Sequence, residues 1–262
     1  MPISNPSKAL RLGTLPRMGS KNFAASLALV IPTLNEADNI GSLLDAIQHA
    51  LQSTDIRYTI IVVDDSSTDG TPHVVRKHMQ RDDRIQLLER SGKNGLAGAI
   101  LHGWAHSDAD LLGVMDADLQ HPPALLPELL LALQAGADIA IGSRYARRNG
   151  VQGWNPVRAA ISRVSTLATR PLLSKKLHVT DPMSGFFIVR RSCIDGIEFQ
   201  TQGFKLLLEV LVRGQIRAVH EVPYQFGLRQ AGKSKASAAV AFHYLSLLGR
   251  LSREVVLRPS SQ

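Results

Sequence analysis

From Leu27 onward, the sequence alternates short, continuous apolar runs with segments whose apolar residues recur at helical spacing. The continuous runs predict buried strands at Leu27–Ile31, Tyr58–Val63, Ile85–Leu88, Leu111–Met115 and Ile139–Ile141. The segments between them predict helices over Asp38–Leu51, from about Thr71, over Gly95–Ala105 and over Pro123–Leu133. Strands that are apolar on both sides need cover on both faces. The pattern therefore predicts an α/β fold with a mainly parallel central sheet and helices on both faces.

The composition fits a folded chain of this kind. Its 262 residues suffice for one large α/β domain or two small ones, and 44% apolar with 20% charged residues excludes a disordered, collagen-like or disulfide-stapled chain. The single cysteine, Cys193, cannot form an internal disulfide or a thiolate metal site. Any bound metal must therefore be held by oxygen or imidazole ligands.

The net charge of +8 is concentrated at the two ends of the chain. Residues 1–27 carry +4 and residues 229–262 carry +5, whereas the 201 residues between them sum to −1. A DNA-binding domain would carry its basic surplus on the folded body, so we expect no nucleic-acid partner.

Three regions are predicted along the chain: a flexible basic tail over residues 1–25, a folded α/β domain over 26–235, and an amphipathic helix with a short tail over 236–262. No secretory signal is predicted, because the basic N-terminal stretch lacks a continuous apolar core before Phe23. No membrane span is predicted either, because the best candidate, Ala236–Gly249, has 14 residues where about 18–20 are needed. The C-terminal helix could lie on an anionic membrane or pack on the core. Translation could start at Met1 or at Met18, and both alternatives stay open.

Acidic and amide side chains follow three of the predicted strands. The segments are PTLNE at 32–36, DDSS at 64–67 and DADLQH at 116–121. Parallel strands end at the same edge of a sheet and ligands bind beyond that edge, so these side chains are expected to share one site. Asp69 is expected instead to cap the helix that starts near Thr71.

The DADLQ segment supplies oxygen ligands for a divalent cation. A bend at the end of the strand lets the carboxylates of Asp116 and Asp118 approach one ion, and the amide oxygen of Gln120 can join them. Such ligands favour Mg²⁺ or Mn²⁺, and both metals remain open. His121 is expected to pack behind the site rather than to bind the metal.

Seven short segments occur in the order found in one enzyme family. They are VIPTLNE at 30–36, VDDSSTDGT at 63–71, GKNGL at 92–96, VMDADLQHP at 114–122, GSRY at 142–145, DPMSGF at 181–186 and RQAGKSK at 229–235. Together they resemble the family 2 glycosyltransferases of the GT-A fold. Within that family they are most similar to the dolichol- or polyprenol-phosphate mannosyltransferases. The resemblance spans about residues 27–250 and assigns residues 26–235 to a GT-A domain.

The resemblance implies roles for individual residues. Donor binding is implied for Pro32, Glu36, Val63, Asp65, Asp116, Ala117, Asp118, Arg229 and Lys235. Contact with the acceptor phosphate is implied for Arg144, Arg158, Ser162 and Ser184. The implied metal ligands are Asp116, Asp118 and Gln120, and the implied catalytic residues are Asp118, Arg144 and Arg229. Leu34 stands where the family usually has an aromatic residue, which leaves the nucleobase open.

The implied reaction is the inverting transfer of mannose from GDP-mannose to dolichyl or polyprenyl phosphate, which gives a β-linked lipid-phosphate sugar. A phosphate acceptor is already anionic near pH 7 and needs no general base. Two alternatives stay open: a polyprenyl-phosphate glucosyltransferase that uses UDP-glucose, and a non-catalytic subunit that binds nucleotide or lipid. The resemblance places the protein on the cytoplasmic face of a membrane, in peripheral contact with anionic lipid or beside a membrane-anchored partner.

Overall fold

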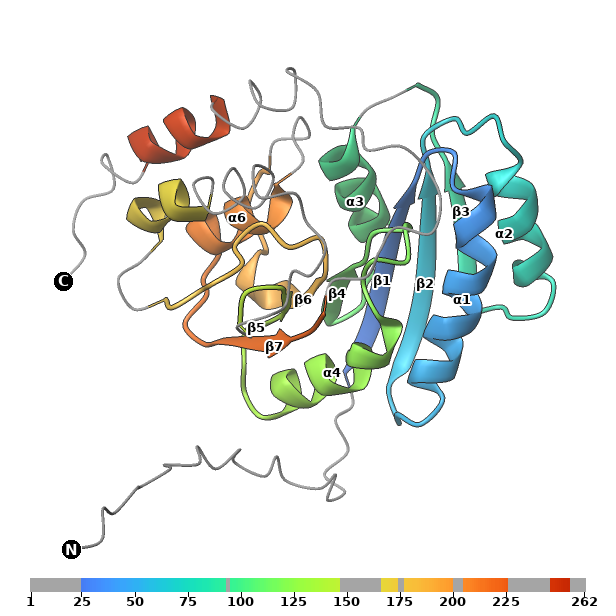
Figure 1. Cartoon of the computed structure of the whole chain (residues 1–262), viewed down its shortest axis with the longest axis horizontal. Helices are drawn as coiled ribbons and strands as arrows, with labels where there is room; N and C mark the ends of the chain where they lie inside the picture. The colour runs from blue at the N-terminus through green and yellow to red at the C-terminus, as the bar shows by residue number, and fades with distance from the viewer. Residues whose placement is uncertain are drawn as a thin grey trace, which may run out of the picture.

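The computed structural model of the chain describes residues 25–92, 95–146, 166–173, 177–199, 205–225 and 246–254. Within these residues, seven strands form one sheet (Figure 1). The strands are β1 (Ser26–Thr33), β2 (Arg57–Asp64), β3 (Ile85–Glu89), β4 (Leu111–Val114), β5 (Ile139–Ser143), β6 (Phe187–Arg190) and β7 (Val219–Pro223). Their order across the sheet is β3-β2-β1-β4-β6-β5-β7.

Helices cover both faces of the sheet (Figure 1). They are α1 (Ala37–Leu51), α2 (Thr71–Met79), α3 (Leu96–Ala105), α4 (Leu126–Gln134) and α6 (Leu206–Arg213), with 3₁₀ turns at Pro123–Leu125, Arg170–Leu172 and Arg191–Cys193. Helices α1, α2 and α4 pack on one face, and α3 and α6 pack on the other. The predicted α/β fold with cover on both faces is confirmed, and the predicted strands and helices lie close to their observed bounds.

The sheet is parallel around β1 and mixed beyond β4. β1 pairs in parallel with β2 and β4, and β2 pairs in parallel with β3. β6 runs antiparallel to both β4 and β5, while β5 pairs in parallel with β7. Thr33 at the end of β1 lies in register with Asp64 at the end of β2. The two strands therefore deliver the residues that follow them to the same edge of the sheet.

The two faces of β1 show how closely the helices lie on the sheet. Leu29 and Ile31 are fully buried on the face that α1 and α4 cover, and Val30 is fully buried on the face that α3 covers. A Cβ placed at Gly103 of α3 would stand 2.7 Å from a methyl group of Val30. Glycine at this position lets α3 lie directly against β1, because the packed side chains around Val30 leave no space for an added Cβ.

Residues 246–254 form a helix that packs on α6. Leu247 and Leu251 are buried in a cluster with Leu208 of α6. Of the two predicted alternatives, the described part of the C-terminal segment takes the packed one. The rest of that segment and the predicted tail over residues 1–24 lie outside the described residues, so the predicted domain limits stay predictions. Within the described residues, no helix is both long and apolar enough to cross a bilayer.

Asp69 joins the start of α1 to the start of α2. Its Oδ1 accepts hydrogen bonds from the backbone N–H and the hydroxyl of Thr71 (3.0 and 2.6 Å). Its Oδ2 accepts one from the backbone N–H of Ala37 (2.9 Å). The predicted cap on α2 is confirmed, and the same carboxylate also caps α1. Burial raises the pKa of Asp69, but these hydrogen bonds outweigh burial and hold the pKa below its ordinary value.

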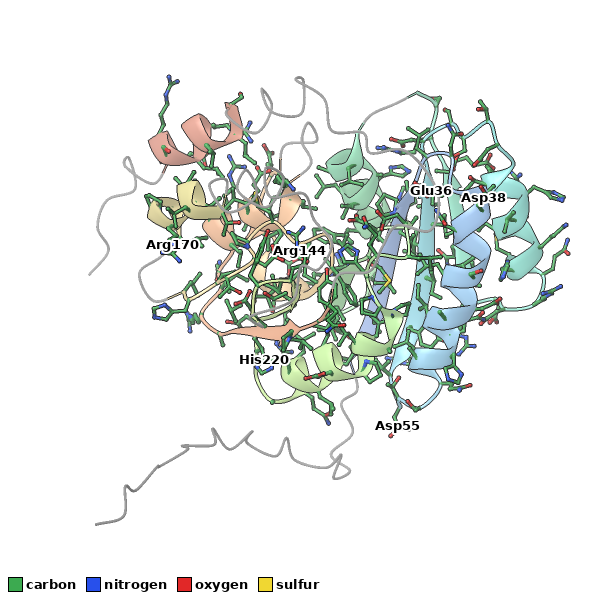
Figure 2. The ribbon with its side chains drawn as sticks, viewed as in Figure 1. Glu36, Asp38, Asp55, Arg144, Arg170 and His220 are labelled. Atoms are coloured by element: carbon green, nitrogen blue, oxygen red, sulfur yellow. The ribbon has the colours of Figure 1, made fainter. Side chains whose placement is uncertain are left out.

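Asp69→Ala is expected to lower the free energy of unfolding by about 1–2 kcal/mol at pH 7, because two helix N-termini lose their acceptor. Since the folded-state pKa of Asp69 is lowered, its contribution is present above the ordinary carboxyl pKa and is lost as the pH falls through the folded-state pKa. Urea unfolding at pH 7 and at about pH 2 measures both effects. Asp55→Ala is the control, since Asp55 is exposed at the opposite end of the sheet (Figure 2). An equal loss in both variants would contradict the capping role.

Candidate active site

Three strands end at one edge of the sheet, and the chain leaves each of them through a residue with left-handed backbone. Asn35 follows β1 with a φ of 57°, Ser66 follows β2 with a φ of 58°, and Leu119 follows β4 with a φ of 59°. In the described part of the chain, no other non-glycine residue has a positive φ. This conformation costs on the order of 1 kcal/mol or more, so it persists only where neighbouring contacts hold it. Strain gathered at one edge is typical of a functional site.

Asp64, the last residue of β2, is a structural carboxylate. It is 1% exposed, and it accepts hydrogen bonds from the hydroxyl of Thr33 (2.9 Å) and from the hydroxyl and backbone N–H of Ser67 (2.6 and 2.8 Å). These bonds join the end of β1 to the turn after β2. Of the two adjacent aspartates that the sequence places at this edge, Asp64 therefore serves the fold.

Asp65 faces Arg90, which follows β3. The guanidinium of Arg90 donates to Asp65 Oδ1 through Nε (2.7 Å) and also contacts that oxygen through Nη2. Nη2 further donates to the carbonyl oxygen of Gly95 at the start of α3 (3.2 Å). Both charged side chains are only 9% exposed. Arg90 was not predicted as a site residue, and the available signal was its position directly after a strand.

The other donor-binding residues implied at this edge lie on or just after β1 and β2. Pro32 and Val63 are buried near the ends of the two strands. Glu36 is half-buried before α1, where its Oε2 accepts a hydrogen bond from the side chain of Asn39 (2.9 Å) (Figure 2). The structure therefore brings these three residues to the same edge as Asp65.

The segment after β4 carries two aspartates of unequal exposure. The side chain of Asp116 is 33% exposed, whereas Asp118 is 8% exposed. The backbone N–H of Gln120 donates to Asp118 Oδ1 (3.2 Å) and closes a tight turn around the left-handed Leu119. Ala117 is buried between the two aspartates. Of these aspartates, Asp116 is the more accessible to a ligand.

Gly185, which precedes β6, leaves the space that the Asp116 carboxylate occupies. A Cβ placed on Gly185 would overlap both carboxylate oxygens of Asp116. The atoms that this Cβ would meet are the end of the Asp116 side chain, so the carboxylate itself would have to move. The position of Asp116 thus depends on a glycine from a separate segment of the chain.

Asp116, Asp118 and Gln120 supply two carboxylates and one amide oxygen from one short segment. Within the described ranges, no group of three His, Cys, Asp or Glu side chains lies close enough together to hold a metal by itself. This donor set fits Mg²⁺ or Mn²⁺, because Mg²⁺ in particular is commonly held by one or two carboxylates and completes its shell with water and substrate phosphates. The assignment of the three ligands stays a prediction.

His121 packs behind the acidic segment, in agreement with the sequence-based expectation. Its ring lies against those of Phe186 and Tyr224, with centroid distances of 5.7 and 5.8 Å. Its Nδ1 is 3.8 Å from Asp116 Oδ2. Burial lowers the pKa of His121 to about 4 and outweighs the opposing effect of Asp118. The ring is therefore neutral at pH 7 and leaves the negative charge of the segment intact.

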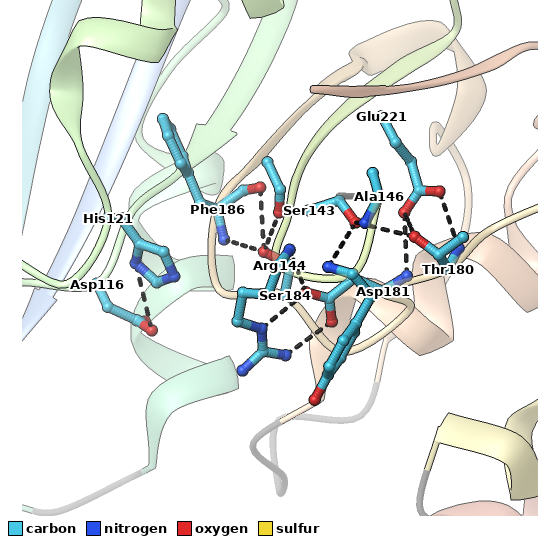
Figure 3. A network of polar contacts seen from close by, with 12 residues as sticks. Asp116, His121, Ser143, Arg144, Ala146, Thr180, Asp181, Ser184, Phe186 and Glu221 are labelled. Atoms are coloured by element: carbon cyan, nitrogen blue, oxygen red, sulfur yellow. Dashed lines mark hydrogen bonds and ion pairs between the residues drawn. The ribbon is translucent and has the colours of Figure 1, made fainter. Parts of the chain in front are cut away.

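Arg144, directly after β5, is bound to Asp181 (Figure 3). Its Nε and Nη2 donate to the two carboxylate oxygens at 2.7 Å each, and its backbone N–H donates to Oδ2 (3.1 Å). Burial lowers the pKa of Arg144, but the hydrogen bonds and charge of Asp181 outweigh burial and raise the pKa above its ordinary value. Arg144 is therefore a fixed cation with a set orientation.

The segment that carries Asp181 is held in turn by Glu221 of β7 (Figure 3). Glu221 accepts hydrogen bonds from the backbone N–H groups of Thr180 (2.8 Å) and Asp181 (3.0 Å) and from the hydroxyl of Thr180 (3.0 Å). The hydroxyls of Ser143 and Thr180 are also hydrogen-bonded (2.9 Å). These supporting roles were not predicted, because the sequence does not show which distant residues become partners.

Lys205 is a further cation of this site that was not predicted. It precedes α6 and lies close enough to Asp116, Arg144 and Asp181 for their charges to act on it. Burial lowers the pKa of Lys205 and Arg144 lowers it further, whereas the two aspartates raise it. Lys205 is thus electrostatically linked both to the segment after β4 and to the Arg144–Asp181 pair.

The remaining residues implied at the acceptor phosphate are less directly placed. Ser184 is buried, and its hydroxyl donates to the carbonyl oxygen of Gly142 (2.7 Å) and accepts from the backbone N–H of Phe186 (3.1 Å). Ser184 joins β5 to β6 in this way, and its role at the acceptor phosphate stays a prediction. Four implied residues lie outside the described residues, namely Arg158, Ser162, Arg229 and Lys235.

The chain is similar to proteins of one known family. The family model described as Glycosyl transferase family 2 matches residues 28–197. A dolichol-phosphate mannosyltransferase from Pyrococcus furiosus is 38% identical over 227 residues, which cover 87% of this chain and 64% of that protein, slightly less than two thirds of its length. Proteins of the same name from Mycosarcoma maydis and Saccharomyces cerevisiae are 33% and 32% identical. Those matches cover 89% and 86% of this chain and 81% and 86% of the two proteins.

Solved structures share the fold. Glucosyl-3-phosphoglycerate synthase from Mycobacterium tuberculosis, in complex with Mn²⁺, UDP-glucose and phosphoglyceric acid, matches with a TM-score of 0.66 at 20% identity, over 90% of this chain and 81% of that one. The same enzyme is also solved with Mg²⁺ and UDP. Mannosyl-3-phosphoglycerate synthase from Rubrobacter xylanophilus matches with a TM-score of 0.65 at 20% identity, over 91% and 77% of the two chains. These matches confirm the predicted GT-A fold.

Gly185→Ala is expected to displace the Asp116 carboxylate and to weaken Mn²⁺ binding about tenfold or more while the fold is retained. Isothermal titration with Mn²⁺ measures the loss, and thermal unfolding checks the fold. Gly249→Ala is the control, because a Cβ at Gly249 meets no atom within 4 Å. Unchanged Mn²⁺ affinity in a folded Gly185→Ala protein would contradict the placement of Asp116 at the metal.

Proposed function

The chain belongs to glycosyl transferase family 2, and from this premise we propose that it is a hexosyltransferase of the dolichol-phosphate mannosyltransferase type. The proposed reaction moves mannose from GDP-mannose to dolichyl or polyprenyl phosphate with inversion, which gives a β-linked lipid-phosphate sugar. The observation that carries the proposal is the similarity to three proteins of that name over 86–89% of this chain. The gathering of carboxylates and carboxylate-paired arginines at one edge of the sheet supports it.

On the donor side, we assign the nucleoside to the ends of β1 and β2. Asp65 accepts a hydrogen bond from the base or the ribose, and Pro32, Glu36 and Val63 line the same pocket. Two basic residues from the segment after β7 bind the diphosphate in this proposal, namely Arg229 and Lys235. Their positive charge stabilises the leaving group as its bond to the sugar breaks.

The acidic segment after β4 is assigned to the metal. Asp116, Asp118 and Gln120 hold Mg²⁺ or Mn²⁺, and Ala117 contacts the nucleotide. When bound, the ion supplies positive charge to the leaving diphosphate. The space at Gly185 and the turn through Gln120 fix the two carboxylates before any substrate arrives, which supports a preorganised site.

On the acceptor side, Arg144 binds the lipid phosphate, with Arg158, Ser162 and Ser184 as further contacts. An oxygen of that phosphate attacks the anomeric carbon, the bond from this carbon to the diphosphate oxygen breaks, and the electron pair leaves with GDP. The attacking oxygen is already anionic near pH 7, so no proton has to be removed. Attack opposite the leaving group inverts the anomeric centre. The fork of hydrogen bonds to Asp181 supports this role, because it holds Arg144 in one orientation.

A lipid acceptor places the reaction at a membrane surface. We propose peripheral contact with the cytoplasmic face through the basic ends of the chain, where each added Lys or Arg near an anionic leaflet contributes on the order of 1 kcal/mol. A membrane-anchored partner is the alternative route to the lipid. The sequence carries a surplus of +9 at its ends, and the part of it that is not assigned to the diphosphate through Arg229 and Lys235 is available for either contact.

The purified chain is expected to transfer radiolabelled mannose from GDP-mannose to a polyprenyl phosphate in detergent, with Mg²⁺ or Mn²⁺ present, and to leave UDP-glucose unused. Parallel reactions with the two donors, extracted into organic solvent and counted, measure this. Transfer from UDP-glucose alone would contradict the assignment of mannose. Binding of both substrates without transfer from either donor would favour the non-catalytic alternative.

Asp118→Asn is expected to lower kcat about 100-fold or more, because the leaving diphosphate loses a metal ligand's support while the turn after β4 is kept. Asp108→Asn is the matched control, since Asp108 is exposed and precedes β4 at the opposite end of the same strand. Initial rates at buffered Mg²⁺ or Mn²⁺ concentrations give the comparison. Wild-type turnover by Asp118→Asn under that metal control would refute the metal role of Asp118.

A further inference from the structure

The Asp65–Arg90 pair joins several segments at the donor edge. The backbone N–H of Arg90 donates to the carbonyl oxygen of Asp64 (2.9 Å), and the carbonyl oxygen of Arg90 accepts from the hydroxyl of Ser66 (2.9 Å). Its guanidinium reaches both Asp65 and the carbonyl oxygen of Gly95. Arg90 is therefore fixed through its backbone and through its side chain to the residues around Asp65.

The two carboxylate oxygens of Asp65 are used differently. Arg90 contacts Oδ1 through both Nε and Nη2. Oδ2 accepts no hydrogen bond from the described residues. It is also not one of the side-chain atoms in those residues that are fully buried without a hydrogen-bond partner. Oδ2 is therefore not fully buried, and it lies at the edge to which we assign the donor nucleoside, while Oδ1 is held in place.

Stability alone is a weak reason for this pair. The attraction between two buried charges is largely offset by the removal of both from water, and apolar residues of similar volume often serve a fold as well. What the pair provides is a carboxylate whose charge is balanced, whose orientation is fixed and whose second oxygen can accept a hydrogen bond. Those properties suit the recognition of a neutral N–H or O–H group.

We propose that Arg90 is a positioning residue for the donor nucleoside, which fixes Asp65 so that its Oδ2 accepts a hydrogen bond from an N–H or O–H group of that nucleoside. The inference rests on the proposed function, because it needs a nucleoside diphosphate at this edge. Its surroundings agree with it. His102 of α3 lies close enough for both charges to act on it, and burial lowers its pKa, so it does not compete with Arg90 as a second cation.

The test compares two ligands of the full chain, a nucleoside diphosphate and inorganic pyrophosphate, each titrated with Mn²⁺ present. GDP and UDP are both titrated on the wild type, and the one that binds more tightly is used for the variants. Arg90→Gln is expected to raise the Kd of the nucleoside diphosphate about tenfold or more and to leave the Kd of pyrophosphate within about twofold. Pyrophosphate reports the metal and diphosphate positions, which Arg90 does not contact. An equal loss for both ligands would overturn the proposal, because it would show a structural role only.

Arg84→Gln is the control, because Arg84 also pairs with an aspartate but lies at the opposite end of β3, with its side chain 48% exposed. Its guanidinium donates to both carboxylate oxygens of Asp82 (2.9 and 2.8 Å) and lies over the ring of Tyr58, 4.6 Å from the centroid. This variant is expected to keep wild-type Kd values for both ligands even where its thermal stability falls. Equal weakening of nucleotide binding in the two variants would overturn the proposal.

Two further variants keep the test decisive where Arg90→Gln does not fold. Arg90→Lys retains the charge but cannot span Asp65 and Gly95, so it is expected to weaken nucleotide binding severalfold; wild-type affinity would overturn the proposal. In an Asp65→Asn background, loss of Arg90 is expected to raise the Kd of the nucleoside diphosphate by no more than a further factor of about two, since both residues act through one hydrogen bond. Losses that multiply in the double variant would overturn the proposal.

The outcomes also separate this inference from the proposed function. A wild-type chain that binds pyrophosphate but neither GDP nor UDP refutes the proposed function, and the inference falls with it. A wild-type chain that binds nucleotide while the Arg90 variants bind it equally well refutes the inference alone.

Discussion

The structure depends on the carboxyl ends of β1, β2 and β4 being held at one level. Parallel pairing of these strands aligns their ends. The pairing of β1 with β4 continues one residue beyond β4, where the backbone N–H of Met115 donates to the carbonyl oxygen of Val30 (3.1 Å). The buried carboxylate of Asp64 then joins the ends of β1 and β2 through hydroxyls from both. After these strands, the backbone passes through three residues in the left-handed conformation, and each of them turns the chain sharply. The contacts that satisfy buried polar groups are thus the same contacts that place the ligand-facing residues.

The order of strands and helices around β1 could be predicted because each of these elements carries its own signal. A continuous apolar run between two amphipathic segments indicates a strand with cover on both faces, and no distant partner is needed to recognise it. The reversed direction of β6 could not be predicted in this way. Phe187–Arg190 has three apolar residues followed by an arginine, and so short a run does not show which way the strand crosses the sheet.

The chemistry of the site could be predicted, but its partners could not. Asp116 and Asp118 are close in sequence, so their common use is visible in the sequence itself. The bonds from Arg90 to Asp65 and from Arg144 to Asp181 join residues 25 and 37 positions apart, and a single sequence carries no periodic trace of such pairs. Adjacent aspartates pose the same problem. Asp64 and Asp65 look alike in the sequence, and only the hydroxyl groups of Thr33 and Ser67 around one of them decide which serves the fold.

Charge pairing leaves this edge acidic, although the substrates proposed above are anionic. Each of the two arginines described at this edge is already paired with an aspartate, so these pairs add no net charge. Asp116 and Asp118 outnumber Lys205, and the described edge therefore keeps a negative surplus. Two phosphate-bearing substrates can approach such an edge only when further positive charge reaches it. The chain carries that charge at its ends and not on its body, so a divalent cation and basic residues from the C-terminal stretch would reverse the sign of the edge. Binding of the second phosphate-bearing substrate would then depend on the positive charge that is brought to the edge when the first one binds.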